Sequence, residues 1–217
     1  MIALVRYTFA TMLHAQRYLA PVLLYLAALG VISRNDNGPL PPVYALCGGV
    51  LVICATWVTM ALISVEEPTH RLITVVTAGR SSRVLLASVL VALISCLVLA
   101  CAGLVLPLLL GTHPVTVADL VLGTEALLLC ACVGITIGLL CSRLVIRRQG
   151  HAFVVALALV MIMLLVRGLP VNVLIRLMAT TVHAADVLAE AAALLGAAVV
   201  LLVAGTVATQ TISVRRD

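Results

Sequence analysis

Long apolar runs alternate with short polar stretches along this chain of 217 residues. Six runs are nearly continuous in Leu, Val, Ile and Ala, have helical length, and lack the period-two alternation of an outer-membrane strand. Because isolated strands cannot satisfy their backbone in lipid, these runs predict transmembrane helices. The predicted spans cover residues 19–33, 43–63, 84–111, 119–141, 151–166 and 187–212.

The first eighteen residues follow a different pattern. Apolar residues such as Val5, Phe9 and Met12 share one helical face, and Arg6 and Arg17 lie around the other. This division is typical of an amphipathic helix that rests in the membrane interface. We therefore expect residues 1–18 to form an interfacial helix that precedes the first span.

A less regular segment, GLPVNVLIRLMATTVHAAD, separates spans five and six. It is long for a simple turn, and Pro170, Asn172 and Arg176 make it a poor full span. One or two short helices at the outer interface satisfy both constraints.

The composition supports this membrane assignment. Hydrophobic residues make up 64% of the chain and charged residues only 10%. A water-soluble domain of this length needs more polar surface, so we expect one integral membrane domain over residues 1–217.

Every basic side chain is arginine and there is no lysine, which excludes the lysine-containing phosphate-binding loop of ATPases. If the protein uses ATP, another polypeptide must bind it.

The distribution of arginine predicts the orientation. Six spans place both termini on one side of the membrane. If that side is the cytoplasm, ten of the thirteen arginines are cytoplasmic, and only Arg34, Arg167 and Arg176 are outside. Short cytoplasmic loops carry an excess of basic residues, so we expect both termini in the cytoplasm and the protein in the cell membrane.

The polar segment Ser64–Arg83 joins spans two and three. Glu66 and Glu67 precede Pro68, which suits the first turn of a helix, and their charges suit the positive end of that helix. Gly79 offers a left-handed stop. The apolar stripe between these ends consists of Leu72, Ile73, Val75 and Val76. At about eleven residues this helix is too short to cross a bilayer, so it is a surface helix or a contact through which an external motor acts.

Two carboxylates lie within predicted spans: Glu125 in span four and Glu190 in span six. An ionisable group in a span is costly unless it faces protein or water, so both are candidate functional residues. The alternative is an interfacial carboxylate paired with an arginine such as Arg167 or Arg176.

Other residue patterns bear on packing and chemistry. Gly134 and Gly138 form a GxxxG pair, which allows close approach either of another helix in the chain or of a second copy. The seven cysteines are expected to act as small apolar packing residues. No metal-ligand spacing, nucleophile elbow or catalytic carboxylate pair is present, so we expect neither an enzyme nor a metal site. The basic excess suits topology and anionic headgroups and does not indicate nucleic-acid binding.

The order of these segments resembles the membrane permeases of ATP-binding-cassette transporters of the type-2 exporter class, particularly small actinobacterial members. The resemblance covers the whole chain as an arrangement and is most specific in EEPTHRLITVVTAGRSSR, which is similar to the coupling segment of that family, and in CSRLVIRRQG after span four. The resemblance implies an all-α fold of six transmembrane helices, with the N-terminal interfacial helix, a cytoplasmic coupling helix between spans two and three, and short outer helices between spans five and six.

It also implies the partners. Two cytosolic ATPase subunits bind ATP and Mg²⁺, this chain binds no cofactor itself, and a second permease, identical or a paralogue, completes the complex in the lipid bilayer. The positions expected to face the ATPase are Glu66, Glu67, Pro68, His70, Arg71 and Leu72.

We expect export of an apolar or amphipathic compound such as a drug, lipid or peptide, because Thr56 and Thr59 are among the few polar side chains of the predicted pathway. One alternative is the substrate-binding membrane component of an energy-coupling-type importer. A second, a membrane enzyme acting on lipid, requires clustered Asp, His or Ser at one depth, and no such cluster is seen.

Overall fold

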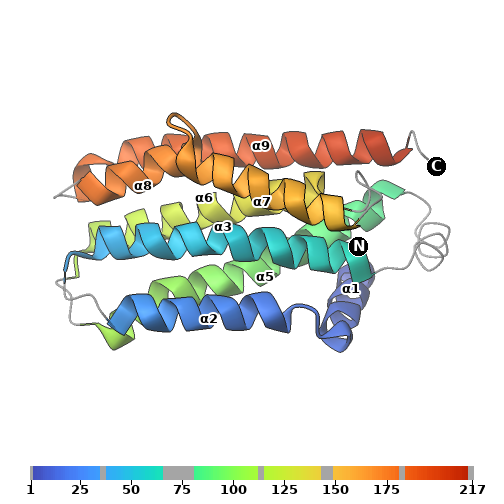
Figure 1. Cartoon of the computed structure of the whole chain (residues 1–217), viewed down its shortest axis with the longest axis horizontal. Helices are drawn as coiled ribbons and strands as arrows, with labels where there is room; N and C mark the ends of the chain where they lie inside the picture. The colour runs from blue at the N-terminus through green and yellow to red at the C-terminus, as the bar shows by residue number, and fades with distance from the viewer. Residues whose placement is uncertain are drawn as a thin grey trace.

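The computed structural model describes residues 2–34, 38–65, 81–111, 115–142, 149–180 and 184–214. These residues form eight α-helices and one 3-10 helix and contain no strand, so the predicted all-α class is confirmed. The long helices lie along one axis as a bundle (Figure 1). The elements are α1 (Ile2–Ala15), α2 (Leu19–Arg34), α3 (Leu40–Val65), α5 (Ser81–Leu110), α6 (Val117–Leu140), α7 (Gln149–Leu165), α8 (Pro170–Thr180), η1 (Ala184–Asp186) and α9 (Leu188–Val214).

Four helices, α3, α5, α6 and α9, are each long and apolar enough to cross a membrane. Helices α2 and α7 have 16 and 17 residues, fewer than the roughly 20 that a bilayer requires. Each of them meets the same criteria only together with a bent neighbour, α1 or α8. The described part of the chain therefore holds four to six candidate spans, which is compatible with a multi-pass membrane protein, and the predicted six is the upper limit.

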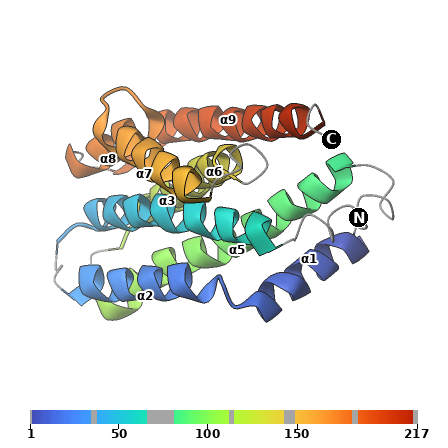
Figure 2. The ribbon, with the colours of Figure 1, turned by 45° about the vertical axis from the view of Figure 1, so that its right-hand side comes forward.

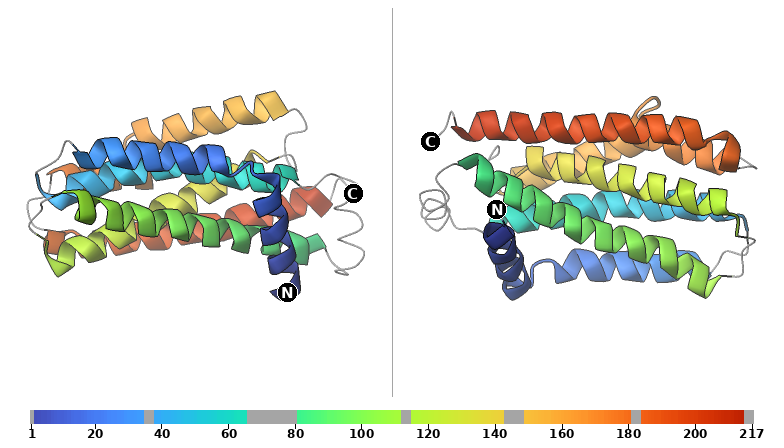
Figure 3. Two further views of the ribbon diagram at one scale, coloured as in Figure 1. Left: turned by 90° about the horizontal axis from the view of Figure 1, so that it is seen from below. Right: turned by 180° about the vertical axis from the view of Figure 1, so that it is seen from behind.

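Both bent pairs turn at a residue with positive φ. Helix α1 meets α2 at 77°, next to Gln16 with a φ of 53°, and α7 meets α8 at 41°, next to Gly168 with a φ of 95°. The amide Nδ2 of Asn172 donates to the carbonyl oxygen of Leu164 and so satisfies one of the last carbonyls of α7. Because of the 77° bend between α1 and α2, helix α1 lies across one end of the bundle (Figure 3). Helix α9 ends at the same end.

Helix α6 forms the centre of the bundle. It packs most extensively against α3 on one side and α9 on the other, and most of its residues are buried. The three helices run in the same direction, toward the end that α1 crosses (Figure 1). Helices α2, α5 and the α7–α8 pair pack around this central layer. The apolar side chains on the outside of the bundle, such as Leu109 at 74% exposed and Val154 at 65%, suit a lipid environment.

Four helices, α3, α5, α6 and α7, begin two or three residues before the predicted spans. Helix α3 starts at Leu40 rather than residue 43 and takes Pro41 and Pro42 into its first turn, where a missing N–H costs nothing. Helix α6 starts at Val117, with Thr116 as its N-cap. The Thr116 hydroxyl accepts from the Asp119 backbone N–H, and the Asp119 carboxylate accepts from the Thr116 backbone N–H, which is a capping box.

Candidate functional site

The segment predicted to contact an ATPase lies outside the described residues. Its predicted contact positions are Glu66, Glu67, Pro68, His70, Arg71 and Leu72. The two helices that it joins are described: α3 ends at Val65 and α5 begins at Ser81. Both helix ends lie at the end of the bundle where α1 is found (Figure 2).

The two threonines predicted to line a pathway are buried in the contact between α3 and α6. Thr56 is 4% exposed and Thr59 is 1% exposed. The Thr56 hydroxyl donates to the carbonyl oxygen of Val52 at 2.8 Å and lies 3.1 Å from that of Gly134 on α6. The Thr59 hydroxyl donates to Ala55 in the preceding turn at 2.8 Å. Both hydroxyls therefore have hydrogen-bond partners within the packed helices α3 and α6. That these threonines line a transport pathway stays a prediction.

Gly134 and Gly138 face α3 of the same chain. A Cβ atom at Gly134 would lie 2.7 Å from the Ala55 Cβ and 2.8 Å from the Val52 carbonyl oxygen. A Cβ atom at Gly138 would lie 2.6 Å from the Thr59 Cβ and 2.9 Å from a backbone oxygen of α3. Of the two contacts left open by the sequence, the glycine pair makes the internal one. Glycine allows α3 and α6 to approach closely, as small residues do between transmembrane helices.

Glu125 and Glu190 belong to the half of the bundle far from α1. Glu125 on α6 is partly exposed, and its Oε2 is buried with no hydrogen-bond partner among the described residues. Glu190 is exposed in the first turn of α9, where a negative charge suits the helix dipole. In the described part of the chain neither carboxylate forms an ion pair with Arg167 or Arg176. The arginine pairing considered from the sequence is thus not formed here, and the function of both residues stays open to test.

A cavity of about 410 Å³ opens at the end of the bundle near α1. This volume is in the range of roughly 300–1,000 Å³ typical of ligand sites. Arg17, in the turn between α1 and α2, is the one residue with a formal charge among those that line it. The lining residues are Arg17, Trp57, Met60, Ala61, Ser64, Cys141, Ser142, Ala152 and Phe153.

A second cavity of about 120 Å³ adjoins the first and shares Trp57, Met60 and Phe153 with it. The rings of Trp57 on α3 and Phe153 on α7 meet edge to face, with centroids 6.4 Å apart. The remaining lining residues are Leu24, Ile53, Thr56, Ala156, Leu157 and Val160. We name the two cavities together the α2–α3–α7 groove, after the helices that supply most of its walls.

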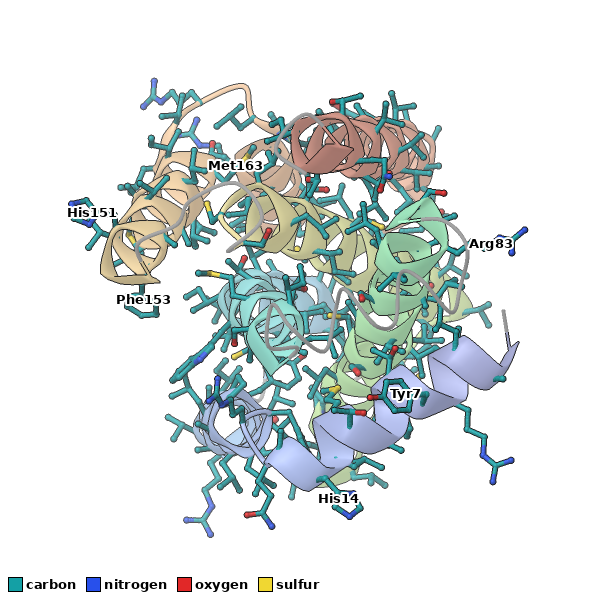
Figure 4. The ribbon with its side chains drawn as sticks, turned by 90° about the vertical axis from the view of Figure 1, so that its right-hand side faces the viewer. Tyr7, His14, Arg83, His151, Phe153 and Met163 are labelled. Carbon is teal, nitrogen blue, oxygen red and sulfur yellow. The ribbon has the colours of Figure 1, made fainter. Side chains whose placement is uncertain are left out.

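The groove is polar at one end and apolar at the other. Arg17, Ser64 and Ser142 line the part near α1, and the deeper part has almost entirely hydrocarbon walls. Along α3, Ser64 and Ile53 are eleven residues apart, which is about 16 Å at the rise of an α-helix. In the view along the bundle axis, Phe153 points from α7 toward the side that carries α3 and α2 (Figure 4).

A separate cavity of about 210 Å³ lies between α5 and α9. Ser82, Thr206, Gln210 and Thr211 supply its polar atoms, and none of its lining residues is charged. It therefore offers hydrogen bonds but no charge for recognition. Among the described residues, no group of three or more His, Cys, Asp or Glu side chains is arranged to hold a metal ion.

The sequence did not reveal the α2–α3–α7 groove, because its walls come from helices that are distant in the chain. Trp57 is the only tryptophan and Phe153 is one of two phenylalanines. That scarcity of aromatic residues was the available signal. It could not show that the two rings face each other, because one sequence does not tell which sides of two spans meet.

Comparison with known proteins gives no relative from which function can be transferred: no family model, curated protein or solved structure matches this chain.

Proposed function

We propose that this protein is the membrane-spanning subunit of an ATP-driven exporter and that separate cytosolic ATPase subunits power it. A second permease, identical or a paralogue, completes the complex. The exported compound is apolar or amphipathic. The chain has no ATPase site of its own and acts by changing the arrangement of its spans.

The arrangement at one end of the bundle carries this proposal. Helix α1 lies across that end, and its Thr8 and Met12 are buried while its Arg6 is exposed, as is Arg17 in the turn that follows it. The segment with Glu66 and Glu67 joins α3 to α5 at the same end. In this proposal a soluble partner acts on this end of the bundle, through α1 and through the acidic residues that connect α3 to α5 in the sequence.

The composition supports a transport subunit rather than a complete machine. The absence of lysine means that ATP binding by the usual phosphate loop requires another polypeptide. The described helices form four to six candidate spans, with only short connections between most of them. In this proposal the energy source acts from outside the bundle.

The composition of the native complex tests the proposal. The tagged chain is extracted in mild detergent, and the mass and ATP hydrolysis of the purified complex are measured. We expect two ATPase subunits for every two permeases, with hydrolysis that elutes at the mass of the complex. An isolated chain without ATPase activity would contradict the proposal. Tight binding of one small water-soluble ligand by that isolated chain would favour the importer component instead.

A further inference from the structure

We propose that the α2–α3–α7 groove is a binding site for an anionic phospholipid, with the lipid phosphate at Arg17 and an acyl chain along the apolar part of the groove. This site is a property of the single chain and does not depend on an ATPase partner. It assigns a ligand class to a surface that the sequence did not single out.

The polarity of the groove matches that of a phospholipid. In a bilayer, a lipid places its phosphate at the interface and its acyl chains in the hydrocarbon core. The groove has the same order: Arg17 lies where α1 crosses the bundle, and Leu24, Ile53 and Val160 line the deeper part. An arginine guanidinium suits phosphate because it can donate two parallel hydrogen bonds. The groove and the lipid are therefore complementary in charge and in the order of their polar and apolar parts.

An unpartnered hydroxyl lies at the polar end of the groove. Ser142, which follows α6, is 1% exposed and lines the larger cavity. Its Oγ is buried and has no hydrogen-bond partner among the described residues. Buried hydroxyls in proteins nearly always have a partner, and a rotation of the Ser142 side chain toward the cavity would give this one a headgroup oxygen as its acceptor. In contrast, the Ser64 hydroxyl at the same end already donates to the carbonyl oxygen of Ala61 at 2.8 Å.

The other described groove lacks these features. The cavity between α5 and α9 is lined by no charged residue. It gives an anionic headgroup no counter-charge, so of these two sites we expect selection for anionic lipid at the α2–α3–α7 groove and not between α5 and α9. This difference allows a test by charge alone.

Trp57 provides a direct reporter, because it lines both cavities of the groove and is the only tryptophan in the chain. The purified chain is reconstituted in phosphatidylcholine vesicles that contain a small fraction of brominated phosphatidylglycerol or of brominated phosphatidylcholine. Bromine quenches tryptophan fluorescence on contact. We expect brominated phosphatidylglycerol to reach half-maximal quenching at a mole fraction about five times lower than brominated phosphatidylcholine does. This factor is the preference that one arginine near an anionic surface supplies.

Variants assign the preference to the groove. Arg17→Gln should abolish the preference for anionic lipid, Arg17→Lys should retain most of it, and Ser142→Ala should reduce it. Arg6→Gln is the matched control, because Arg6 is an exposed arginine of α1 outside the groove. Helix content by circular dichroism shows that each variant is folded.

Three outcomes would overturn the site. They are equal quenching by both lipids in the unmodified chain, an undiminished preference in Arg17→Gln, and an equal loss of preference in Arg6→Gln and Arg17→Gln. Competition by soluble glycerol phosphate would assign the groove to a free anion and would also overturn a lipid site. None of these results bears on whether an ATPase joins the chain.

Discussion

Substitution of Gly138 by alanine tests the contact at the centre of the bundle. The added methyl group would lie 2.6 Å from the Thr59 Cβ and 2.9 Å from a backbone oxygen of α3. Carbon atoms pack favourably at about 3.5–4.0 Å, so the methyl group would be about 1 Å too close. Because one of the two neighbours is backbone, a side-chain rotation cannot relieve the overlap, and α3 and α6 must separate.

The expected cost combines two effects. Overpacking of a tight core costs about 1–3 kcal/mol. Separation of the helices also lengthens the 3.1 Å approach of the Thr56 hydroxyl to Gly134, and interhelical hydrogen bonds of this kind in membranes are worth about 0.6 kcal/mol on average. We therefore expect Gly138→Ala to lower the free energy of unfolding by about 1–3 kcal/mol.

The assay is unfolding of the purified chain in mixed micelles with increasing sodium dodecyl sulfate, followed through Trp57 fluorescence. Gly196→Ala is the control, because a Cβ atom at this glycine of α9 would meet nothing within 4 Å. Its unfolding midpoint should stay close to that of the unmodified chain or rise slightly, since alanine is the better helix former. Equal midpoints for the two variants would refute the packing argument. A change in oligomeric mass with unaltered unfolding in Gly138→Ala would assign the glycine pair to a contact between copies.

Two further predictions use the same unfolding assay, and a third uses amide hydrogen exchange. Gly168→Ala should destabilise the protein by about 1–3 kcal/mol, because alanine is strained at a φ of 95°. The control Gly150→Ala should be nearly neutral, because a Cβ atom there would meet nothing within 4 Å, and equal effects of the two substitutions would contradict the argument from strain. Thr116→Ala should cost about 1 kcal/mol through loss of the α6 cap, and an unchanged midpoint would show that the cap contributes nothing. Gln16 has a φ of 53°, so Gln16→Asn should be tolerated and Gln16→Val should destabilise the turn between α1 and α2. The destabilised turn should show as faster amide hydrogen exchange in α1, and equal exchange in both variants would refute a strained turn.

The positions of the helices could be predicted from the sequence because lipid leaves few alternatives. A run such as Val117–Leu140 must form its backbone hydrogen bonds internally, so its apolar length alone predicts a helix. The ends were less predictable, since Pro41 and Pro42 look like loop residues and yet fit the first turn of α3. The turn at Gln16 had no signal, because glutamine seldom adopts positive φ.

The relations between helices could not be predicted from one sequence. The GxxxG pair indicated close approach, but whether Gly138 meets Thr59 of the same chain or a second copy depends on which faces of the helices meet. The meeting of Trp57 and Phe153 depends on the same three-dimensional information. The predicted contact residues from Glu66 to Leu72 lie outside the described residues and stay predictions.

The most direct test of the exporter proposal is ATP hydrolysis by the native complex that carries Glu66→Lys together with Glu67→Lys. Asp186→Lys is the matched control, because it reverses an exposed carboxylate in η1, at the opposite end of the bundle. We expect the double variant to insert and fold normally but to lose both the stimulation of hydrolysis by the permease and ATP-dependent export, while Asp186→Lys retains both. Unchanged hydrolysis and export in the double variant would contradict the coupling function assigned to this segment.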